Sequence, residues 1–188
     1  CGAFQAKVTA TTPEAIEHAI FRASQYLQDS GQQSDGSFSP KSGPAITALC
    51  ITALVRTGTA VDSRMVSRAV AYLLTFQQSD GGIYQPESAV ANYETSIALL
   101  ALHECNSSGQ YEEIIQKARQ FLTVIQWDES EGNTYADPEY GGAGYGRHER
   151  PDLSNTAFLI DALKGVGASS DDPAIQRALI FVSRSQNL

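Results

Sequence analysis

The stretch Gln32-Gln33-Ser34-Asp35-Gly36 occurs a second time, letter for letter, at Gln77-Gln78-Ser79-Asp80-Gly81, 45 residues further along the chain. A glycine after an aspartate is typical of a turn, because glycine readily adopts the left-handed conformation that many turns require. Self-similarity at a fixed spacing is the sequence signature of repeat architectures. The two copies therefore predict a protein built from tandem structural units.

A helical pattern leads into each of these turns. It consists of a basic residue, Ala, two variable positions, an aromatic residue, an aliphatic residue and a later Gln, and it occurs at 22–32, 68–77, 117–126 and 177–186. More apolar segments of helix length lie between these copies and begin at Thr47, Thr95 and Thr156. Each unit is therefore expected to be an amphipathic helix, a turn and a second, more apolar helix. Neither helix can bury its apolar face alone, so the units must stack side by side.

We expect seven helices and no strands. The expected helices lie at about 13–29, 44–57, 63–77, 91–105, 110–126, 153–165 and 173–187. A polar segment, 1–12, precedes a repeat domain, 13–188, whose units span about 13–58, 63–109, 110–167 and an incomplete 171–188. Helix starts are marked at Thr12-Pro13 and Asp172-Pro173, since a capping residue followed by proline favours a helix N-terminus. Because the last unit stops before its turn and second helix, the pattern favours a fragment of a longer protein.

Composition and charge exclude several classes of protein. The 188 residues are 42% apolar and 18% charged, which is typical of a globular domain. The net charge is −8 and the basic residues are scattered, so nucleic acid is not an expected partner. No apolar run reaches the ~20 residues of a transmembrane helix. An odd count of three cysteines indicates no disulfide framework. The start Cys1-Gly2-Ala3 suits an exported bacterial lipoprotein, but a trimmed cytoplasmic chain would look the same.

The helical pattern with its Gln resembles the QW repeat of squalene and hopene cyclases and their prenyltransferase relatives, from about residue 13 to the end. The resemblance implies an all-α, partial α/α toroid, with an inner ring of helices inside an outer ring around an apolar cavity. It also implies that the Gln side chain ties a helix end to a neighbouring backbone while an aromatic residue stacks nearby. That aromatic is Phe38 in the first copy, but Ile83 followed by Tyr84 in the second, so the second fastening is expected to be degenerate.

One long insertion, 127–152, interrupts the third unit. It contains the run Tyr140-Gly141-Gly142-Ala143-Gly144-Tyr145-Gly146, which lets a backbone pack closely against a helix end or a ligand. Two interpretations remain open: a turn folded over one rim of the toroid, or one wall of a pocket mouth. In the second interpretation the ligand-binding residues are Tyr140, Gly142, Gly144, Tyr145 and Arg147. Nearby His148 is a candidate general base.

The segment Asp152-Leu153-Ser154-Asn155-Thr156-Ala157 is similar to the D-x-D-D-T-A motif of hopene-type cyclases, whose middle Asp is the general acid. Here that position is Ser154, and a serine hydroxyl cannot protonate an alkene. Prenyltransferase β subunits carry a zinc-binding Asp-x-Cys pair at this place, but Ser154 again replaces the critical residue. The resemblance therefore leaves Asp152 as the catalytic candidate, with no metal and no cofactor expected. The simpler interpretation is that Asp152 or Ser154 caps the following helix.

Two functions remain open at this stage. The first is a cyclase-like or prenyltransferase-like toroid that binds a hydrophobic, isoprenoid-type ligand, with or without catalysis. The second is a non-catalytic binding or scaffold protein that recognises a glycan or a protein. An open toroid would also expose apolar helix faces, which predicts self-association or contact with missing repeats.

Overall fold

The computed structural model describes residues 12–147 and 149–186, and the regular structure there is helical. The α-helices in this part span Pro13–Tyr26 (α1), Ala45–Arg56 (α2), Arg64–Leu74 (α3), Ala91–Glu104 (α4), Glu112–Val124 (α5), Leu153–Gly165 (α6) and Pro173–Ser183 (α7). A π-helical turn follows α1 at Leu27–Gly31, and 3₁₀ turns lie at Pro40–Ser42 and Glu129–Glu131. The β-structure of the described residues is limited to one isolated bridge between Gln77 and Ile83. The all-α prediction is confirmed.

Every α-helix lies within the range that the sequence predicts for it. The expected helix at 13–29 ends earlier, at Tyr26, and continues as the π-helical turn. Residues 1–11, 148 and 187–188 lie outside the described residues. The export prediction that rests on Cys1 therefore stays a prediction, as do the boundaries of the repeats.

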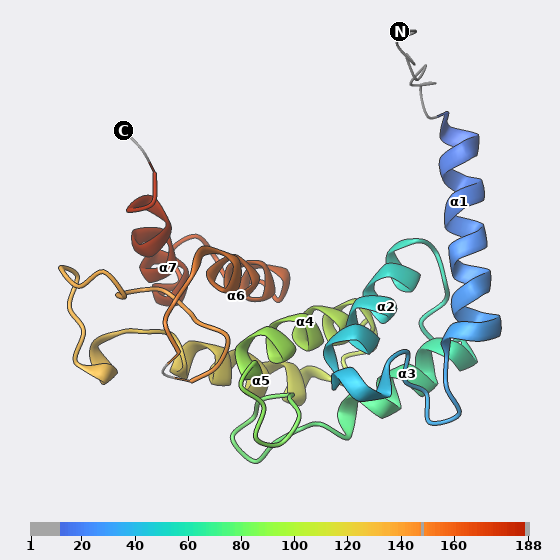
Figure 1. The fold of residues 1–188 in the computed structure, drawn as a ribbon, viewed down its shortest axis with the longest axis horizontal. Coiled ribbons are helices and arrows are strands. Elements are labelled where there is room, and N and C mark those ends of the chain that lie inside the picture. Colours follow the sequence, from blue (N-terminus) through green and yellow to red (C-terminus); the bar gives the residue numbers. More distant parts are fainter. Residues whose placement is uncertain (1–11, 148, 187–188) are drawn as a thin grey trace, which may run out of the picture.

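The helices form two rows. Helix α4 contacts both α2 and α6, which makes these three the inner row. The outer row is α3, α5 and α7, and each of these packs against the inner helix that precedes it in the chain. Figure 1 shows the two rows following an arc, with α1 projecting from one end. The chain is thus a partial α/α toroid, as predicted.

The inner helix α4 explains why the rows exist. Apolar and small side chains lie on nearly all of its sides, and ten of its fourteen residues are buried. A helix of this composition must be enclosed by neighbours, since its apolar surface is otherwise exposed to water. Within the described part of the chain, no helix combines the length and the apolar character needed to cross a bilayer.

The outer helices bury only one face. In α3 the buried residues are Val66, Ala69, Val70 and Leu73, which recur at the three- and four-residue spacing of one helix face. In α5 the corresponding residues are Ile115, Ala118, Phe121 and Leu122. Helix α1 is the exception, because none of its residues is buried.

Glutamine side chains join one unit to the next. The Gln126 amide Nε2 donates hydrogen bonds to the carbonyl of Gly141 in its own turn and to the carbonyl of Ala174 in α7, both at 2.9 Å. The Gln32 amide likewise donates to Gly36 at 3.1 Å and to Met65 in α3 at 2.8 Å. Each amide therefore links the turn after one outer helix to the first turn of the next outer helix.

Glycines allow the same turns to lie against the next outer helix. Gly36, Gly81 and Gly141 all have positive φ, at +97°, +92° and +84°. A Cβ on these glycines would lie 2.3, 2.7 and 1.8 Å from the carbonyl oxygens of Arg68, Lys117 and Arg177 respectively. Those basic residues begin the repeated helical pattern. The glycine and the basic residue of the sequence repeat thus meet in space, one unit apart.

Threonines complete the joints. The hydroxyls of Thr47, Thr95 and Thr156 accept hydrogen bonds from the backbone N–H groups of Phe38, Ile83 and Ala143, at 3.1, 3.1 and 3.0 Å. Each donor lies two residues after the turn glycine, and each threonine lies within the first five residues of an inner helix. The hydroxyl therefore holds the turn against the inner helix that follows it.

The joints differ in strength, which gives a first prediction. Gln126 is fully buried, so Gln126→Met should remove two hydrogen bonds, leave the buried Gly141 carbonyl without its donor and lower the free energy of unfolding by about 1–3 kcal/mol. Gln77 is exposed and no side-chain hydrogen bond holds it among the described residues, so Gln77→Met should cost less than about 0.5 kcal/mol. Urea denaturation measures both. Equal losses would show that the glutamine amides do not hold the units together.

Candidate functional site

The insertion 127–152 begins at Trp127, whose backbone closes the first part of the insertion into a loop. The Trp127 carbonyl accepts a hydrogen bond from the N–H of Gly141 at 2.7 Å, and the Trp127 N–H donates to the carbonyl of Gly142 at 2.9 Å. Residues 128–140 therefore form a closed acidic loop. The glycine-rich segment 141–146 then leaves this loop and runs towards α4.

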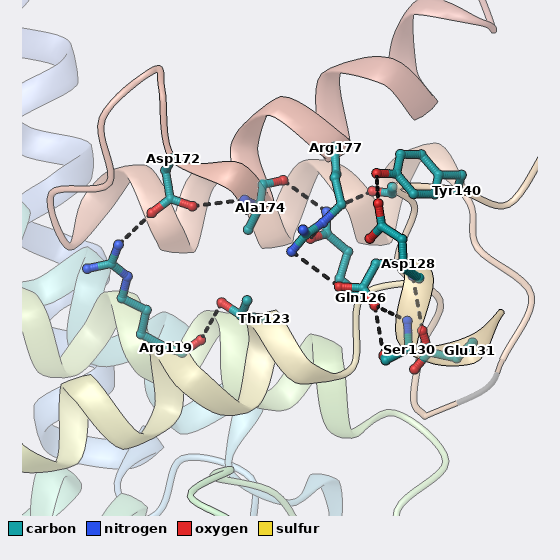
Figure 2. A network of polar contacts seen from close by, with 12 residues as sticks. Arg119, Thr123, Gln126, Asp128, Ser130, Glu131, Tyr140, Asp172, Ala174 and Arg177 are labelled. Carbon is teal, nitrogen blue, oxygen red and sulfur yellow. Dashed lines mark hydrogen bonds and ion pairs between the residues drawn. The ribbon is translucent and has the colours of Figure 1, made fainter. Parts of the chain in front are cut away.

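The acidic loop is fastened to α7, as Figure 2 shows. Asp128 forms an ion pair with Arg177 at 3.3 Å, and Glu131 accepts the N–H of Asp128 at 3.0 Å. The Tyr140 hydroxyl donates to Glu129 at 2.6 Å, and this hydrogen bond raises the pKa of Tyr140. Tyr140 is buried, so its ring does not line an open pocket mouth.

The glycines pack against the chain itself. Gly142 and Gly144 are both buried. A Cβ on Gly142 would lie 2.5 Å from the Cβ of Pro151, and a Cβ on Gly144 would lie 2.4 Å from the carbonyl oxygen of Glu149. The sequence allows this segment to pack closely against either a helix end or a ligand. In the structure the segment packs closely against other residues of the same chain.

The same segment covers the start of α4. The Asn92 side-chain amide donates to the carbonyl of Gly144 at 2.7 Å, and the Asn92 backbone N–H donates to the carbonyl of Tyr145 at 2.9 Å. The first N–H groups of a helix have no partner within the helix and need outside acceptors. The insertion supplies one of these acceptors, while the Tyr145 side chain stays half exposed, at 51%.

Arg147 is held in a cluster that joins the insertion to the second unit. Its guanidinium lies 3.2 Å from Asp80 and its Cζ lies 5.1 Å from the centre of the Phe121 ring. The Tyr84 ring stacks on Phe121 with centres 5.4 Å apart, and the Tyr84 hydroxyl donates to Asp80 at 2.8 Å. Burial, followed by the hydrogen bond to Asp80 and its charge, raises the pKa of Tyr84 to about 12. We call Asp80, Tyr84, Phe121 and Arg147 the arginine cluster.

Two grooves meet at Arg147. The first, of about 220 Å³, is lined by Ser79, Asp80, Gly81, Lys117, Gln120, Phe121, Val124 and Arg147. The second, of about 320 Å³, is lined by Tyr84, Glu87, Ser88, Ala89, Ala91, Gly146, Arg147 and Glu149. Both are surface grooves lined about equally by polar and apolar atoms. Arg147 thus forms a wall that the two grooves share.

Asp152 caps α6. One carboxylate oxygen accepts the backbone N–H of Asn155 at 2.9 Å, and the other accepts the Asn155 side-chain amide at 2.7 Å. The prediction of a helix cap at this place is confirmed. Ser154 is exposed, whereas Asn155 is buried and its Oδ1 has no hydrogen-bond partner among the described residues.

Glu94 is a buried carboxyl group at the start of α4. It is only 3% exposed, and its Oε2 accepts the N–H of Gln85 at 3.2 Å. Its Oε1 lies against Gly43, where a Cβ would come within 2.3 Å of it. Burial raises the pKa of Glu94, with hydrogen bonds from Ser88 and Gln85 acting in the opposite direction. Among the described residues, Glu94 has the most buried carboxyl side chain.

Comparison with protein families matches residues 39–188 to the Squalene-hopene cyclase C-terminal domain. The chain belongs to that family. The match covers α2 to α7 and begins after α1. No curated protein matches the chain significantly.

In this member of the squalene-hopene cyclase C-terminal domain family, the predicted site residues do not lie on one surface. Tyr140, Gly142 and Gly144 are buried, whereas Tyr145 and Arg147 are exposed. His148 lies outside the described residues, so its predicted role as a base stays a prediction. The catalytic role of Asp152 also stays a prediction, since its observed role is that of a helix cap.

Sequence reasoning missed two carboxyl groups of this cyclase-family domain. Asp80 was assigned to turn chemistry alone, although it also binds Arg147 and Tyr84. Glu94 was overlooked within an apolar helix. It immediately precedes Thr95, as Asn155 precedes Thr156, so an alignment of the threonine positions would have exposed it.

The burial of Glu94 predicts a pH-dependent effect on stability. A raised pKa means that folding disfavours the charged carboxylate, so ionised Glu94 destabilises the fold above that pKa and has no such effect once both states are protonated. Glu94→Gln keeps an acceptor for the Gln85 N–H and removes the charge. Its midpoint of thermal unfolding should exceed that of the wild type at pH 7. The difference should shrink towards zero near pH 4.

The exposed Asp161→Asn also removes one carboxylate charge; it is the matched control and should change neither midpoint. Thermal unfolding followed by circular dichroism at both pH values measures these differences. A Glu94→Gln variant that is less stable than the wild type at pH 7 would contradict a destabilising buried carboxylate.

Proposed function

We propose that this squalene-hopene cyclase family domain is a binding module without cyclase chemistry, and that it recognises an acidic glycan beside Arg147. The observation that carries the proposal is the fixed guanidinium of Arg147 at the wall between two grooves.

Arg147 suits a sugar carboxylate. Arginine presents five N–H donors in a planar fork that matches a carboxylate. Stacking on Phe121 and the contact with Asp80 restrain this fork before any ligand arrives, which lowers the entropy lost on binding. The side chain remains 42% exposed. Donors that Asp80 does not use are therefore available to a ligand.

The first groove supplies further matching chemistry. Lys117 and Gln120 add a second cation and an amide beside Arg147. Val124, which is 50% exposed, offers apolar surface for the C–H face of a sugar ring. A pyranose uronic acid has a carboxylate, hydroxyls and such an apolar face. This groove therefore accommodates each chemical part of an acidic sugar.

The second groove offers acceptors and hydroxyl partners for a neighbouring sugar. Glu87, Ser88 and Glu149 line it together with Tyr84. Glu87 has φ +62° in the turn after Gln85, a conformation that favours glycine. Glu87 thus adds a carboxylate acceptor to the groove lining despite an unfavourable backbone conformation. The two grooves together favour an oligosaccharide over a single sugar.

The polar groups near the cyclase motif support binding rather than proton transfer to an alkene. Both oxygens of Asp152 accept hydrogen bonds from Asn155, and the position of the general acid is Ser154. Glu94 lies against Gly43 and Gln85 inside the protein. None of these three groups is arranged as an exposed acid facing an apolar cavity.

Calorimetric titration with trigalacturonate tests the glycan proposal. The wild type should bind this acidic trisaccharide, with affinity that falls as salt rises, and should not bind the uncharged cellotriose. Arg147→Ala should weaken binding by about tenfold or more, because the charge-assisted hydrogen bonds are lost. The fold should survive, since an exposed ion pair contributes only about 0–1 kcal/mol.

The exposed Arg150→Ala, in the same insertion, is the matched control and should retain wild-type affinity. Equal binding of trigalacturonate by wild type and Arg147→Ala would place the ligand elsewhere. Failure of the wild type to bind any acidic oligosaccharide would defeat the proposal.

A hydrophobic, isoprenoid-type ligand is the second candidate function. It is supported by the family match and by Leu153, which is 48% exposed next to Ser154 at the start of α6. The half-exposed Tyr145 offers an aromatic face of the kind that attracts a cation. Catalysis on such a ligand would need an acid, for which Asp152 is the candidate in the motif.

Product analysis separates the two candidates. Incubation with squalene, and separately with a prenyl diphosphate, should give no product with either the wild type or Asp152→Asn, because Asp152 serves as a helix cap. Mass spectrometry of the extracted lipid measures the outcome. Cyclised or transferred product from the wild type that disappears in Asp152→Asn would establish the enzyme and overturn the binding proposal.

A further inference from the structure

Helix α1 carries the packing residues of an outer helix, yet it buries none of them. In α3, α5 and α7 the alanine that follows the basic residue is fully buried: Ala69, Ala118 and Ala178. The equivalent residue of α1, Ala23, is exposed. Three residues earlier, Val66, Ile115 and Ile175 are at most 3% exposed, whereas the equivalent Ile20 of α1 is 36% exposed. The face of α1 that the repeat normally buries is therefore open.

Helix α2 leaves a matching side open. The residue before the repeated threonine is buried in α4 and α6, as Glu94 and Asn155, but it is Ile46 in α2 and 37% exposed. Two residues after the threonine, Ile97 of α4 is 2% exposed, while Leu49 of α2 is 42% exposed. Ile46 and Leu49 are three residues apart and thus share one side of α2.

The contact between Glu94 and Gly43 shows which side this is. Gly43 immediately precedes α2, and a Cβ on it would lie 2.3 Å from the Glu94 carboxylate. The Glu94 side of α4 therefore faces α2. By the repeat, the Ile46 side of α2 faces away from α4, at the open end of the inner row. Figure 1 shows α1 projecting at that end.

We propose that two copies of this chain pair by exchange, with α1 of each copy lying on the Ile46 and Leu49 side of α2 in the other copy. The second copy is the occupant that the chain itself supplies, because each molecule has one amphipathic helix with an uncovered apolar face and one uncovered apolar side of α2. In a dimer with two-fold symmetry, α1 of each copy covers the open side of α2 in the other copy, and the two contacts form one self-complementary interface. The two helices are of similar length, at 14 and 12 residues.

The α2 half of the proposed contact brings no unpaired charge. The charged residue of α2 is Arg56 at its C-terminal end, and Glu104 of the same chain pairs with it at 2.7 Å. The exposed side of α2 therefore brings no unpaired charge to the interface, although the chain as a whole carries −8. Apolar contact between two acidic chains should be strengthened rather than weakened by salt, because salt screens their mutual repulsion.

Sedimentation of the full chain over a range of concentrations tests the pairing. We expect a reversible dimer that persists at high salt. Ile20→Asp and Leu49→Asp should each weaken it by about tenfold or more, because a charge would be buried in an apolar contact. Val124→Asp and Leu179→Asp alter similarly exposed apolar residues on α5 and α7 and should leave the dimer unchanged. Circular dichroism checks that all four variants fold, as their exposed positions predict.

Mixing the two disruptive variants tests the exchange itself. In a dimer of Ile20→Asp with Leu49→Asp, one of the two α1–α2 contacts carries both substitutions and the other carries none. The mixture should therefore associate more tightly than either variant alone. Contacts of α1 with α1 and α2 with α2 would give no such recovery. A wild-type chain that stays monomeric at all concentrations, or a mixture that shows no recovery, would overturn the proposal.

Discussion

The fold depends on one constraint: an inner helix that is apolar on nearly every side must be enclosed by other helices. Helix α4 satisfies this constraint by packing against α2, α5 and α6. Enclosure also buries the turns that connect the helices, and buried carbonyl and N–H groups require hydrogen-bond partners. The side chains that recur in the sequence supply these partners. Gln126 donates to two carbonyls, Thr156 accepts an N–H, and Gly141 allows the close approach that both contacts need.

Local signals explain why the helices could be predicted from the sequence. Apolar residues at helical spacing, threonine and aspartate caps, and glycine turns are all encoded within a few residues of the feature that they determine. The partners of each helix are not encoded in this way. Helix α1 carries the same pattern as α3, yet Ala23 is exposed and Ala69 is buried, because burial depends on which helix lies opposite. The pattern identifies a face that can be buried, and only the three-dimensional arrangement shows what covers it.

The candidate site was less predictable because its contacts span long distances in sequence. Asp80 and Arg147 are 67 residues apart, and no local pattern links them. The glycine-rich segment predicts a close approach of the backbone to another group. The sequence does not show whether that group is a ligand or the protein itself, and in the structure Gly144 packs against Glu149 of the same insertion. Glu94 was hidden because a single carboxyl group barely alters the apolar character of α4. The cap at Asp152 was predictable, since an N-cap aspartate acts within its own helical turn.

The replacement at Asn155 bears on chemistry as much as the one at Ser154. The motif that this segment resembles has a carboxyl group at both positions, and closely spaced carboxyls hold a proton between them because two adjacent negative charges repel each other. Here the Asn155 amide lies 2.7 Å from Asp152 and donates a hydrogen bond to it. That contact occupies one carboxylate oxygen of Asp152, and the amide brings no acid of its own to the site. The same two residues therefore make a well-satisfied helix cap, in which both oxygens of Asp152 already accept hydrogen bonds from Asn155. The helix cap alone thus explains the arrangement of the residues in this motif-like segment. The proposed glycan site therefore lies at Arg147 and not at the motif.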